Sequence, residues 1–399
     1  MPMTHSSYRH QRSAGIFRTP RFLRRFRRNT QAVSFSGNKV ELFRDGGDFF
    51  PAMFREFDRA TRHICIEFYI LRNDRIGNQF AAALIKAAKR GVSVYLMYDY
   101  LGSIETSGAY FRRLEHAGIT CLPFNRLSFK RNLALFDRRN HRKFAVIDGT
   151  KAFLGGINIG DEYAGYGDSV FHWRDTGIRL EGPAVVQLQK LFVELWTSET
   201  GSFPTKIAIP TLLTPAGNAE VMVVSGGPHH NASYIRSAFR MAIAGAAKSV
   251  RIVTPYFVPG PRIVRSLLRA AKKGVHVQLL LPAVSDVPLV QIASRAYLSP
   301  LLKAGIEIYE RQGTILHAKV MLIDSCWATV GSANFDLRSF HRNYEVNVVI
   351  DSPEFGRQID EMFGQDLSQS RQVTLQEYEK RSWAEKTLER LCDPIRRFL

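Results

Sequence analysis

The sequence predicts an α/β fold made of two similar lobes, and two internal repeats carry that prediction. Residues 87–92 (AAKRGV) recur as 270–275 (AAKKGV), each time after an apolar helical pattern and before a β-rich run. The apolar run at 64–70 recurs at 252–258, in the same order relative to the first repeat. Strands that alternate with helical stretches favour helices layered around a mixed or mostly parallel sheet in each copy.

The chain is expected to divide into five consecutive segments. A length of 399 residues, 45% of them hydrophobic, suits two domains of ordinary size with substantial cores. A stretch rich in proline and glycine separates the two copies and is typical of a connector. The expected segments are a basic arm at 1–37, a first lobe at 38–200, a linker at 201–218, a second lobe at 219–372 and a basic segment at 373–399.

The arm has no acidic side chain, because the first one in the chain is Glu41. Its arginines are interleaved with apolar residues, and this mixture is typical of a segment at an anionic membrane surface, where each basic residue contributes about 1 kcal/mol. A solubilising tail is the alternative. If the arm is a membrane segment, removing residues 1–34 leaves the lobes intact. The arginines of the arm are Arg9, Arg12, Arg18, Arg21, Arg24, Arg25, Arg27 and Arg28, and the apolar residues between them are Phe17, Phe22, Leu23 and Phe26.

The C-terminal segment mixes apolar and basic side chains in the same way. It is either a second interfacial helix or a helix packed on the second lobe. Its apolar residues are Trp383, Leu388, Leu391, Ile395 and Phe398.

Net charge, cysteine content and the length of the apolar runs limit the possible binding partners and the cellular environment. The formal charge of +19 favours an anionic partner, which is nucleic acid, a phospholipid surface or a phosphate-bearing substrate. The four cysteines are scattered without a C-x-x-C pair, which fits a reducing cytoplasmic environment. No apolar run approaches the roughly 20 residues of a membrane-spanning helix, so membrane contact is expected to be peripheral.

One motif, H-x-K-x4-D, occurs once in each half of the chain. Its four central residues are apolar and predict a buried strand, whose period of two turns the histidine and lysine toward the same face. The aspartate faces the other way and is expected to anchor the following turn. The motif residues, counted together as the candidate catalytic set, are His141, Lys143 and Asp148 in the first copy and His317, Lys319 and Asp324 in the second.

A small turn ending in asparagine follows each histidine at the same distance. The turns are 155–158 (GGIN) and 331–334 (GSAN). Glycines there let the backbone approach a ligand, and Asn158 and Asn334, together with Ser332, are expected to bind phosphoryl oxygens. In a single H-x-K pair, the histidine is more often a buried core residue whose hydrogen bonds are satisfied within the protein. Duplication of the pair at identical spacing favours a functional site.

Two histidines, two lysines and two asparagines suit displacement at phosphorus. One imidazole attacks, while the other donates a proton to the leaving oxygen and later deprotonates the incoming alcohol or water. The lysines stabilise the equatorial oxygens, in the place of a metal ion. The motifs lack the carboxylate clusters or dense His and Cys ligands of a metal site, so no metal or other cofactor is expected.

A nucleophilic histidine also needs an acceptor for its second ring nitrogen. Two carboxylates are candidates: Asp175, which follows His141 in the first copy, and Glu345, which follows His317 in the second. A surface ion pair is the alternative role for each.

These paired motifs resemble the phospholipase D superfamily over about residues 38–370, and bacterial cardiolipin synthases in particular. Further similar segments are 67–70 (EFYI), 99–102 (DYLG), 255–259 (PYFVP) and 339–347 (SFHRNYEVN). The resemblance implies an α/β/α sandwich in each lobe, one cleft between the lobes, and phosphatidyl transfer through a phosphohistidine. It implies catalytic roles for both motif histidines and lysines, with His141 as the nucleophile. Longer synthases begin with transmembrane helices, so this chain is expected to be of the shorter type.

The expected activity is therefore phosphatidyl transfer between two phosphatidylglycerol molecules, with phosphatidylethanolamine as an alternative donor. The expected place is the cytoplasmic face of a bacterial inner membrane, bound peripherally. A lipid hydrolase, a nuclease and a non-enzymatic phospholipid-binding scaffold are the alternatives. No aromatic run of the kind used to stack single-stranded bases is present, so no nucleic acid partner is expected.

Overall fold

The computed structural model describes residues 16–126, 137–165, 172–210, 214–228, 233–383, 385 and 387. Arg9 and Arg12 of the expected arm lie outside the described residues, as do Leu388, Leu391, Ile395 and Phe398 of the C-terminal segment.

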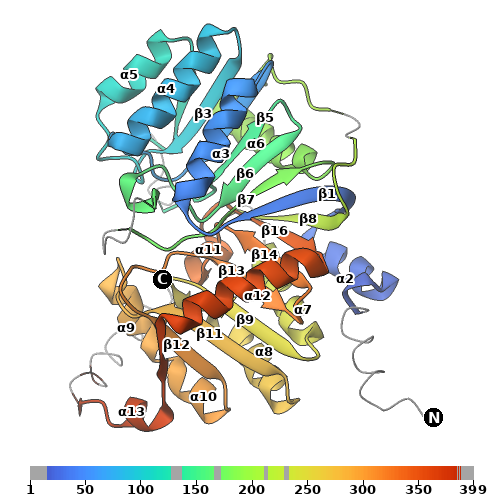
Figure 1. The fold of residues 1–399 in the computed structure, drawn as a ribbon, viewed down its shortest axis with the longest axis vertical. Helices are drawn as coiled ribbons and strands as arrows, with labels where there is room; N and C mark the ends of the chain where they lie inside the picture. The colour runs from blue at the N-terminus through green and yellow to red at the C-terminus, as the bar shows by residue number, and fades with distance from the viewer. Residues whose placement is uncertain are drawn as a thin grey trace.

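In the described part of the chain, fifteen strands form one continuous sheet that runs through both lobes (Figure 1). The two lobes repeat the same strand order. The first contributes β7 (Gly177–Glu181), β6 (Lys151–Gly155), β5 (Phe144–Ile147), β2 (His63–Phe68), β3 (Ser93–Asp99) and β4 (Thr120–Phe124). The second contributes β16 (Glu345–Asp351), β14 (Trp327–Gly331), β13 (Val320–Ile323), β9 (Ser249–Val253), β11 (His276–Pro282) and β12 (Glu307–Arg311). The predicted pair of similar α/β lobes is confirmed.

Parallel and antiparallel strand pairs follow the same order in both lobes. Strands β2, β3 and β4 are parallel, as are β9, β11 and β12, while β5 and β13 run antiparallel to their neighbours. The sheet ends at β17 (Ser370–Val373), and a separate pair joins β10 (Phe257–Val258) to β15 (Phe335–Asp336). Because the parallel strands end at one edge, the segments that follow them meet beside the two histidine motifs.

Helices cover both faces of the sheet. The outer layer consists of α3 (Gly46–Arg59), α4 (Arg75–Lys89) and α5 (Gly108–His116) on the first lobe, and α7 (Tyr234–Gly245), α8 (Gly260–Lys272) and α10 (Leu298–Lys303) on the second. The opposite face carries α6 (Val185–Thr200) and α12 (Pro353–Ser368). Shorter helices are α9 (Pro288–Arg295), α11 (Leu337–His341), α13 (Leu375–Glu379) and a 3-10 turn at Asp161–Tyr163.

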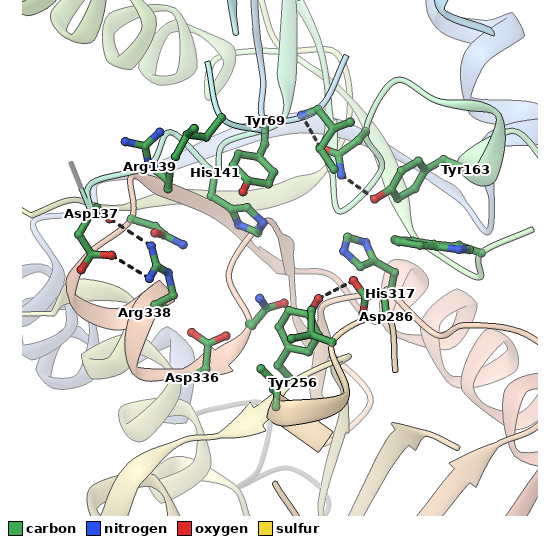
Figure 2. Close-up of a pocket in the computed structure, with 18 residues that line it drawn as sticks. Tyr69, Asp137, Arg139, His141, Tyr163, Tyr256, Asp286, His317, Asp336 and Arg338 are labelled. Atoms are coloured by element: carbon green, nitrogen blue, oxygen red, sulfur yellow. Dashed lines mark hydrogen bonds and ion pairs between the residues drawn. The ribbon is translucent and has the colours of Figure 1, made fainter. Parts of the chain in front are cut away.

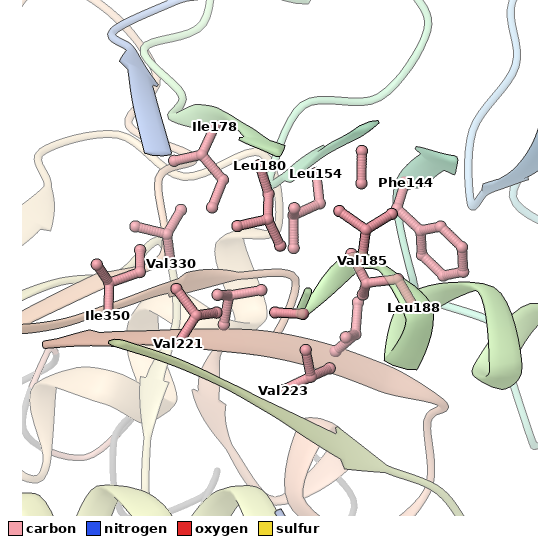
Figure 3. Packing of buried hydrophobic residues seen from close by; sticks show 14 of the residues in the cluster. Phe144, Leu154, Ile178, Leu180, Val185, Leu188, Val221, Val223, Val330 and Ile350 are labelled. Atoms are coloured by element: carbon pink, nitrogen blue, oxygen red, sulfur yellow. The ribbon is translucent and has the colours of Figure 1, made fainter. Parts of the chain in front are cut away.

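One hydrophobic core is shared between the lobes on the α6 and α12 face. Figure 3 shows Leu180 and Val185 of the first lobe beside Val221 and Val330 of the second, all fully buried. Burying such side chains contributes roughly 1.5–3 kcal/mol each. The shared core therefore holds the two lobes together as one packed body.

Strand β1 (Ser34–Phe43) and β8 (Ala219–Gly226) join the two halves of the sheet. The beginning of β1 pairs with β8, where Ser34 lies opposite Met222, and its end pairs with β7. Within the pairing with β8 the register shifts between Phe35 and Asn38, and Gly37 there has a φ of +83°, which glycine adopts without a Cβ clash. The expected boundary after residue 37 thus falls inside a strand.

The described part of the arm contains a helix, α2 (Pro20–Thr30), that packs on the second lobe. Thr19 caps it by accepting a hydrogen bond from the backbone N–H of Phe22, and Pro20 occupies the first turn. The sequence indicates a segment at an anionic membrane surface, but Phe17 and Phe26 belong to the core of the second lobe. Both are buried, with ring centroids 5.5 and 6.2 Å from that of Trp327.

The polar side of α2 faces solvent, because the 3.6-residue period separates its arginines from its aromatics. Its exposed residues include Arg21, Arg24, Arg25, Arg27 and Arg28. Arg18, just before the helix, forms an ion pair with Asp351 at 2.7 Å. Within the described ranges no helix has the length and apolar character required to cross a bilayer.

Candidate active site

A cleft of about 660 Å³ lies between the lobes, and both motif histidines line it (Figure 2). Residues from both lobes contribute. The first lobe supplies Tyr69, Ile70, Leu101, Asp137, Arg139, His141, Asn158, Tyr163 and Trp173; the second supplies Tyr256, Asp286, Val287, Val290, His317, Asn334, Asp336, Arg338 and Asn343.

The motif histidines stand immediately before β5 and β13, as the apolar run after each motif predicts. Lys143 and Lys319 are almost completely buried beside them. Nζ of Lys143 donates a hydrogen bond to the backbone oxygen of His141 at 2.7 Å, and Lys319 makes the same contact to His317. Each lysine is therefore held against its own histidine, two residues away in the segment that leads into the strand.

Each histidine is paired with a carboxylate of the other lobe. Nδ1 of His141 lies 2.9 Å from Oε1 of Glu345, and Nδ1 of His317 lies 2.6 Å from Oδ2 of Asp175. A carboxylate accepts a hydrogen bond, so each Nδ1 carries the proton and each Nε2 keeps its lone pair. In the sequence each carboxylate follows the histidine of its own half, but in the structure it pairs with the histidine of the other half.

Backbone pairing explains this exchange. The N–H of His141 donates to the oxygen of Tyr344 at 2.9 Å, and the N–H of His317 donates to the oxygen of Arg174 at 2.7 Å. The acceptor residue in each case directly precedes the carboxylate. Short bridges between the lobes thus fix the carboxylates beside the imidazoles.

Ser332 does not face the cleft, so the expectation that it binds phosphate is wrong. Its side chain is fully buried, and its hydroxyl donates to Oε2 of Glu345 at 2.5 Å. Nδ2 of Asn343 donates to the other oxygen of Glu345 at 3.2 Å. These two donors orient the carboxylate that holds His141.

Asn158 and Asn334 both line the cleft. Nδ2 of Asn158 donates to the hydroxyl of Tyr163 at 2.8 Å, and its Oδ1 accepts from the N–H of Ile70 at 3.2 Å. Asn158 therefore has one N–H left for a ligand. Oδ1 of Asn334 is buried and has no hydrogen-bond partner among the residues that the structure describes.

The motif aspartates directly follow β5 and β13, at the ends of these strands away from the cleft, but the segments that they hold lead into β2 and β9 and are not the following turns that the sequence indicated. Asp148 accepts hydrogen bonds from the N–H groups of Thr61, Arg62 and His63 at 2.8–2.9 Å. Asp324 accepts from residues 247–249 at 2.7–2.9 Å. Their place in the candidate catalytic set is not supported by their position, because both carboxylates hold backbone N–H groups at the strand ends away from the cleft.

Burial dominates the electrostatics of the site. It lowers the pKa of His141 to about 4, despite the opposing effect of Glu345, and it also lowers the pKa of His317. It lowers the pKa of Lys319 to about 8 and that of Lys143 well below its usual value. Both imidazoles are therefore neutral near pH 7, which is the form that a nucleophile requires. A phosphodiester anion entering beside them favours protonation of one imidazole.

Several aromatic residues complete the site. The ring of Tyr69 packs against His141 with centroids 4.9 Å apart, while Tyr163 and Trp173 flank His317 at 5.4 and 5.3 Å. Tyr256 donates its hydroxyl to Asp286 at 2.7 Å.

Sequence reasoning assigned these residues no role. Tyr69 and Tyr256 lie near the ends of the repeated runs 64–70 and 252–258, and this position could have indicated them. Tyr163 and Asp286 belong to no repeated segment.

No three His, Cys, Asp or Glu side chains are grouped so as to hold a metal ion in the described part of the chain. That the reaction needs no metal stays a prediction.

The family model "Cardiolipin synthase, PLD-like domain" matches residues 53–196 and 239–367, which are the parts of the chain that carry the two motifs. The chain belongs to this family. Among curated members of the cardiolipin synthase family, it is 37% identical to the cardiolipin synthase of Geobacillus sp. (strain WCH70), over 90% of this chain and 72% of the relative. It is 38% identical to cardiolipin synthase 2 of Bacillus anthracis, over 91% of this chain and 71% of the relative.

Solved structures show the same fold beyond the cardiolipin synthases. The phosphatidylserine synthase of Haemophilus influenzae matches with a TM-score of 0.68 over 94% of this chain and 97% of that one, at 11% identity. The polyphosphate kinase of Porphyromonas gingivalis matches with a TM-score of 0.56 over 97% of this chain and 56% of that one, at 13% identity. At such identities the likeness concerns the fold alone.

Proposed function

We propose that this chain is a cardiolipin synthase, a phosphatidyltransferase that joins two phosphatidylglycerol molecules and releases glycerol. Membership of the family and relatives that match about nine-tenths of the chain support the proposal. The observation that carries the mechanism is the pair of imidazoles lining one cleft, each with its Nδ1 held by a carboxylate.

In the first step, Nε2 of His141 attacks phosphorus and the bond to the glycerol oxygen breaks. His317, protonated once the phosphodiester anion is bound, donates its proton to that oxygen, so that glycerol leaves and a phosphatidyl group stays on His141. Lys143 and Lys319 stabilise the non-bridging oxygens, with Asn158 and Asn334 as further donors.

In the second step, a hydroxyl of another phosphatidylglycerol attacks the phosphohistidine. His317 takes the proton of this hydroxyl, the phosphorus–nitrogen bond breaks and cardiolipin forms. One phosphodiester replaces another, so the reaction needs no nucleotide, and added glycerol drives it backwards. Phosphatidylethanolamine fits the same first step as a phosphatidyl donor, with ethanolamine leaving.

The proposed place of work is the cytoplasmic face of the bacterial inner membrane, with peripheral attachment. A formal charge of +19 and the exposed arginines of α2 support attraction to an anionic surface.

The test is to incubate the purified protein with phosphatidylglycerol in mixed vesicles and to measure lipid products and glycerol. Cardiolipin and glycerol should appear one to one, and His141→Ala or His317→Ala should reduce the rate by more than about 10²-fold. Rapid quenching should trap a phosphatidyl group on His141; a phosphatidyl group on His317 would reverse the two roles. Release of phosphatidic acid without cardiolipin would instead show a hydrolase, and cleavage of added single-stranded DNA a nuclease.

A further inference from the structure

A second hollow, of about 350 Å³, lies between α7 and α8 on the outer face of the second lobe. We call it the arginine pocket. Residues at positions 262, 265, 266 and 269 of α8 recur at helical spacing, so they lie along one side of that helix. The lining residues are Arg240 of α7 and Arg262, Arg265, Ser266 and Arg269 of α8.

The arginine pocket carries positive charge that no carboxylate of the described residues balances by an ion pair. Among the described residues, none of its four arginines forms an ion pair with a carboxylate. Nε of Arg265 donates to the backbone oxygen of Pro261 at 3.2 Å. Burial first, and then the nearby Arg262 and Arg240, lower the pKa of the neighbouring Arg236, as expected where cations crowd together.

The equivalent place in the first lobe is built differently. There Asp58 of α3 lies 2.9 Å from Nζ of Lys86 on α4, and it also attracts Arg90. Helix α3 contains three acidic residues, whereas α7 and α8 contain none. The two lobes share one fold, so this charge difference is a property of the second lobe and not a consequence of the architecture.

The surroundings extend the same charge. Helix α7 packs between α8 and α2, and α2 also lacks acidic residues. The burial of Phe17 and Phe26 against Trp327 fixes α2, and with it five exposed arginines, on the second lobe. The arginine pocket and the exposed arginines of α2 therefore lie on neighbouring helices of the second lobe.

We propose that the arginine pocket binds the phosphate of an anionic phospholipid headgroup and thereby docks the second lobe on the bilayer. Guanidinium groups match phosphate oxygens in bidentate geometry, and several of them around one hollow suit a phosphate better than a diffuse surface charge does. The neighbouring arginines of α2 suit an extended anionic surface better than a small soluble ligand. The proposal rests on the proposed function only in that the substrate is a membrane lipid.

The test compares two charge-reversed proteins. Arg262→Glu/Arg265→Glu/Arg269→Glu removes the arginine pocket. The control Arg55→Glu/Lys89→Glu/Arg112→Glu makes the same change in net charge on α3, α4 and α5, at exposed residues that form no ion pair within the described chain. Co-sedimentation with phosphatidylcholine vesicles, with and without phosphatidylglycerol, measures binding, and thermal unfolding shows that both variants fold.

The pocket variant should bind phosphatidylglycerol vesicles at least about tenfold more weakly, because each basic residue near an anionic surface contributes about 1 kcal/mol. The control should stay within about twofold of the wild type. Equal binding by the pocket variant and the wild type would overturn the proposal, and so would an equal loss in the control. If inorganic pyrophosphate binds wild type but not the pocket variant while vesicle binding is unchanged, the site takes a soluble phosphate instead.

Cardiolipin formation in detergent micelles separates this proposal from the proposed function. Micellar substrate does not require docking on a bilayer, so the pocket variant should keep wild-type activity there. If the wild-type protein formed no cardiolipin, the proposed function would be wrong. The docking proposal would still be decided by the vesicle-binding result. The gentler Arg262→Gln/Arg265→Gln/Arg269→Gln variant should give the same pattern if charge reversal impairs folding.

Discussion

Oδ2 of Asp175 lies 2.6 Å from Nδ1 of His317, although these residues belong to different lobes. Glu345 and His141 form the reciprocal pair. Neither lobe therefore contains a complete pair of imidazole and carboxylate, and the catalytic arrangement exists only where the lobes meet.

Exchanging either carboxylate for its amide should slow cardiolipin formation by about 10²- to 10⁴-fold. In Asp175→Asn and Glu345→Gln the amide can donate to Nδ1, which favours the tautomer whose Nε2 carries the proton and cannot attack or accept one. Turnover and thermal unfolding should be measured together. Asp360→Asn, at the partner of Arg251 outside the cleft, is the matched control and should stay near wild type. Wild-type turnover in both site variants would show that the carboxylates do not set the tautomers.

The rate should fall as pH rises through about 8. Burial lowers the pKa of Lys319 to about 8 although nearby carboxylates, Asp175 first, raise it. The charged form of a group with a lowered pKa is present below that value and is lost above it. The alkaline limb should appear in kcat/KM, which reports the free enzyme, and at higher pH in kcat, because the bound anion stabilises the ammonium group.

Lys319→Arg tests this assignment. A guanidinium does not titrate in this range, so the limb near pH 8 should disappear while the rate at neutral pH falls. Lys86→Arg on the surface of α4 should leave the profile unchanged. A limb that persists in Lys319→Arg would have to come from another group.

Removing the Asp148 carboxylate should affect stability and not chemistry. Three backbone N–H groups lose their acceptor in Asp148→Ala. Those of Thr61 and Arg62 belong to exposed residues and can bind water, but His63 is buried, and a buried group left unsatisfied costs about 1–3 kcal/mol. The free energy of unfolding should therefore fall by about 1–3 kcal/mol, while kcat of the folded fraction stays within about threefold. Glu361→Ala, at an exposed position on α12, is the control. A large loss of kcat without loss of stability would return Asp148 to the catalytic set.

Truncating Phe26 should destabilise the second lobe. The ring is fully buried against Trp327, and loss of such a side chain costs about 3–5 kcal/mol. Phe26→Ala should lower the unfolding temperature, whereas Arg24→Ala on the exposed side of α2 should not. For the same reason, removal of residues 1–34 is now expected to damage the fold. Equal unfolding temperatures in Phe26→Ala and wild type would show that α2 is not held as described.

Sequence reasoning succeeded where a feature depends on local periodicity. The same-side placement of His141 and Lys143, and the opposite placement of Asp148, follow from the two-residue period of a strand. Duplication at equal spacing predicted two similar lobes, because two copies of one local pattern fold alike.

Sequence reasoning failed where a feature depends on which distant segments of the chain are neighbours in the fold. The acceptor of His317 lies in the other half of the chain, and no local pattern states that segments 174–175 and 316–317 are neighbours. Likewise, the alternation of cationic and aromatic residues in α2 suits a membrane or a protein core equally well, and only Trp327 decides between them. Ser332 was misplaced because a G-S-x-N turn does not reveal which way its hydroxyl points.

The position of β1 also affects how the molecule is made. Its first residues pair with β8, which leaves the ribosome only after the whole first lobe has been synthesised. Until then the nascent first lobe carries an unsatisfied strand edge beside the apolar side chains that later enter the shared core, and such edges pair readily with other chains. Premature termination before β8 is therefore expected to yield a product prone to aggregation.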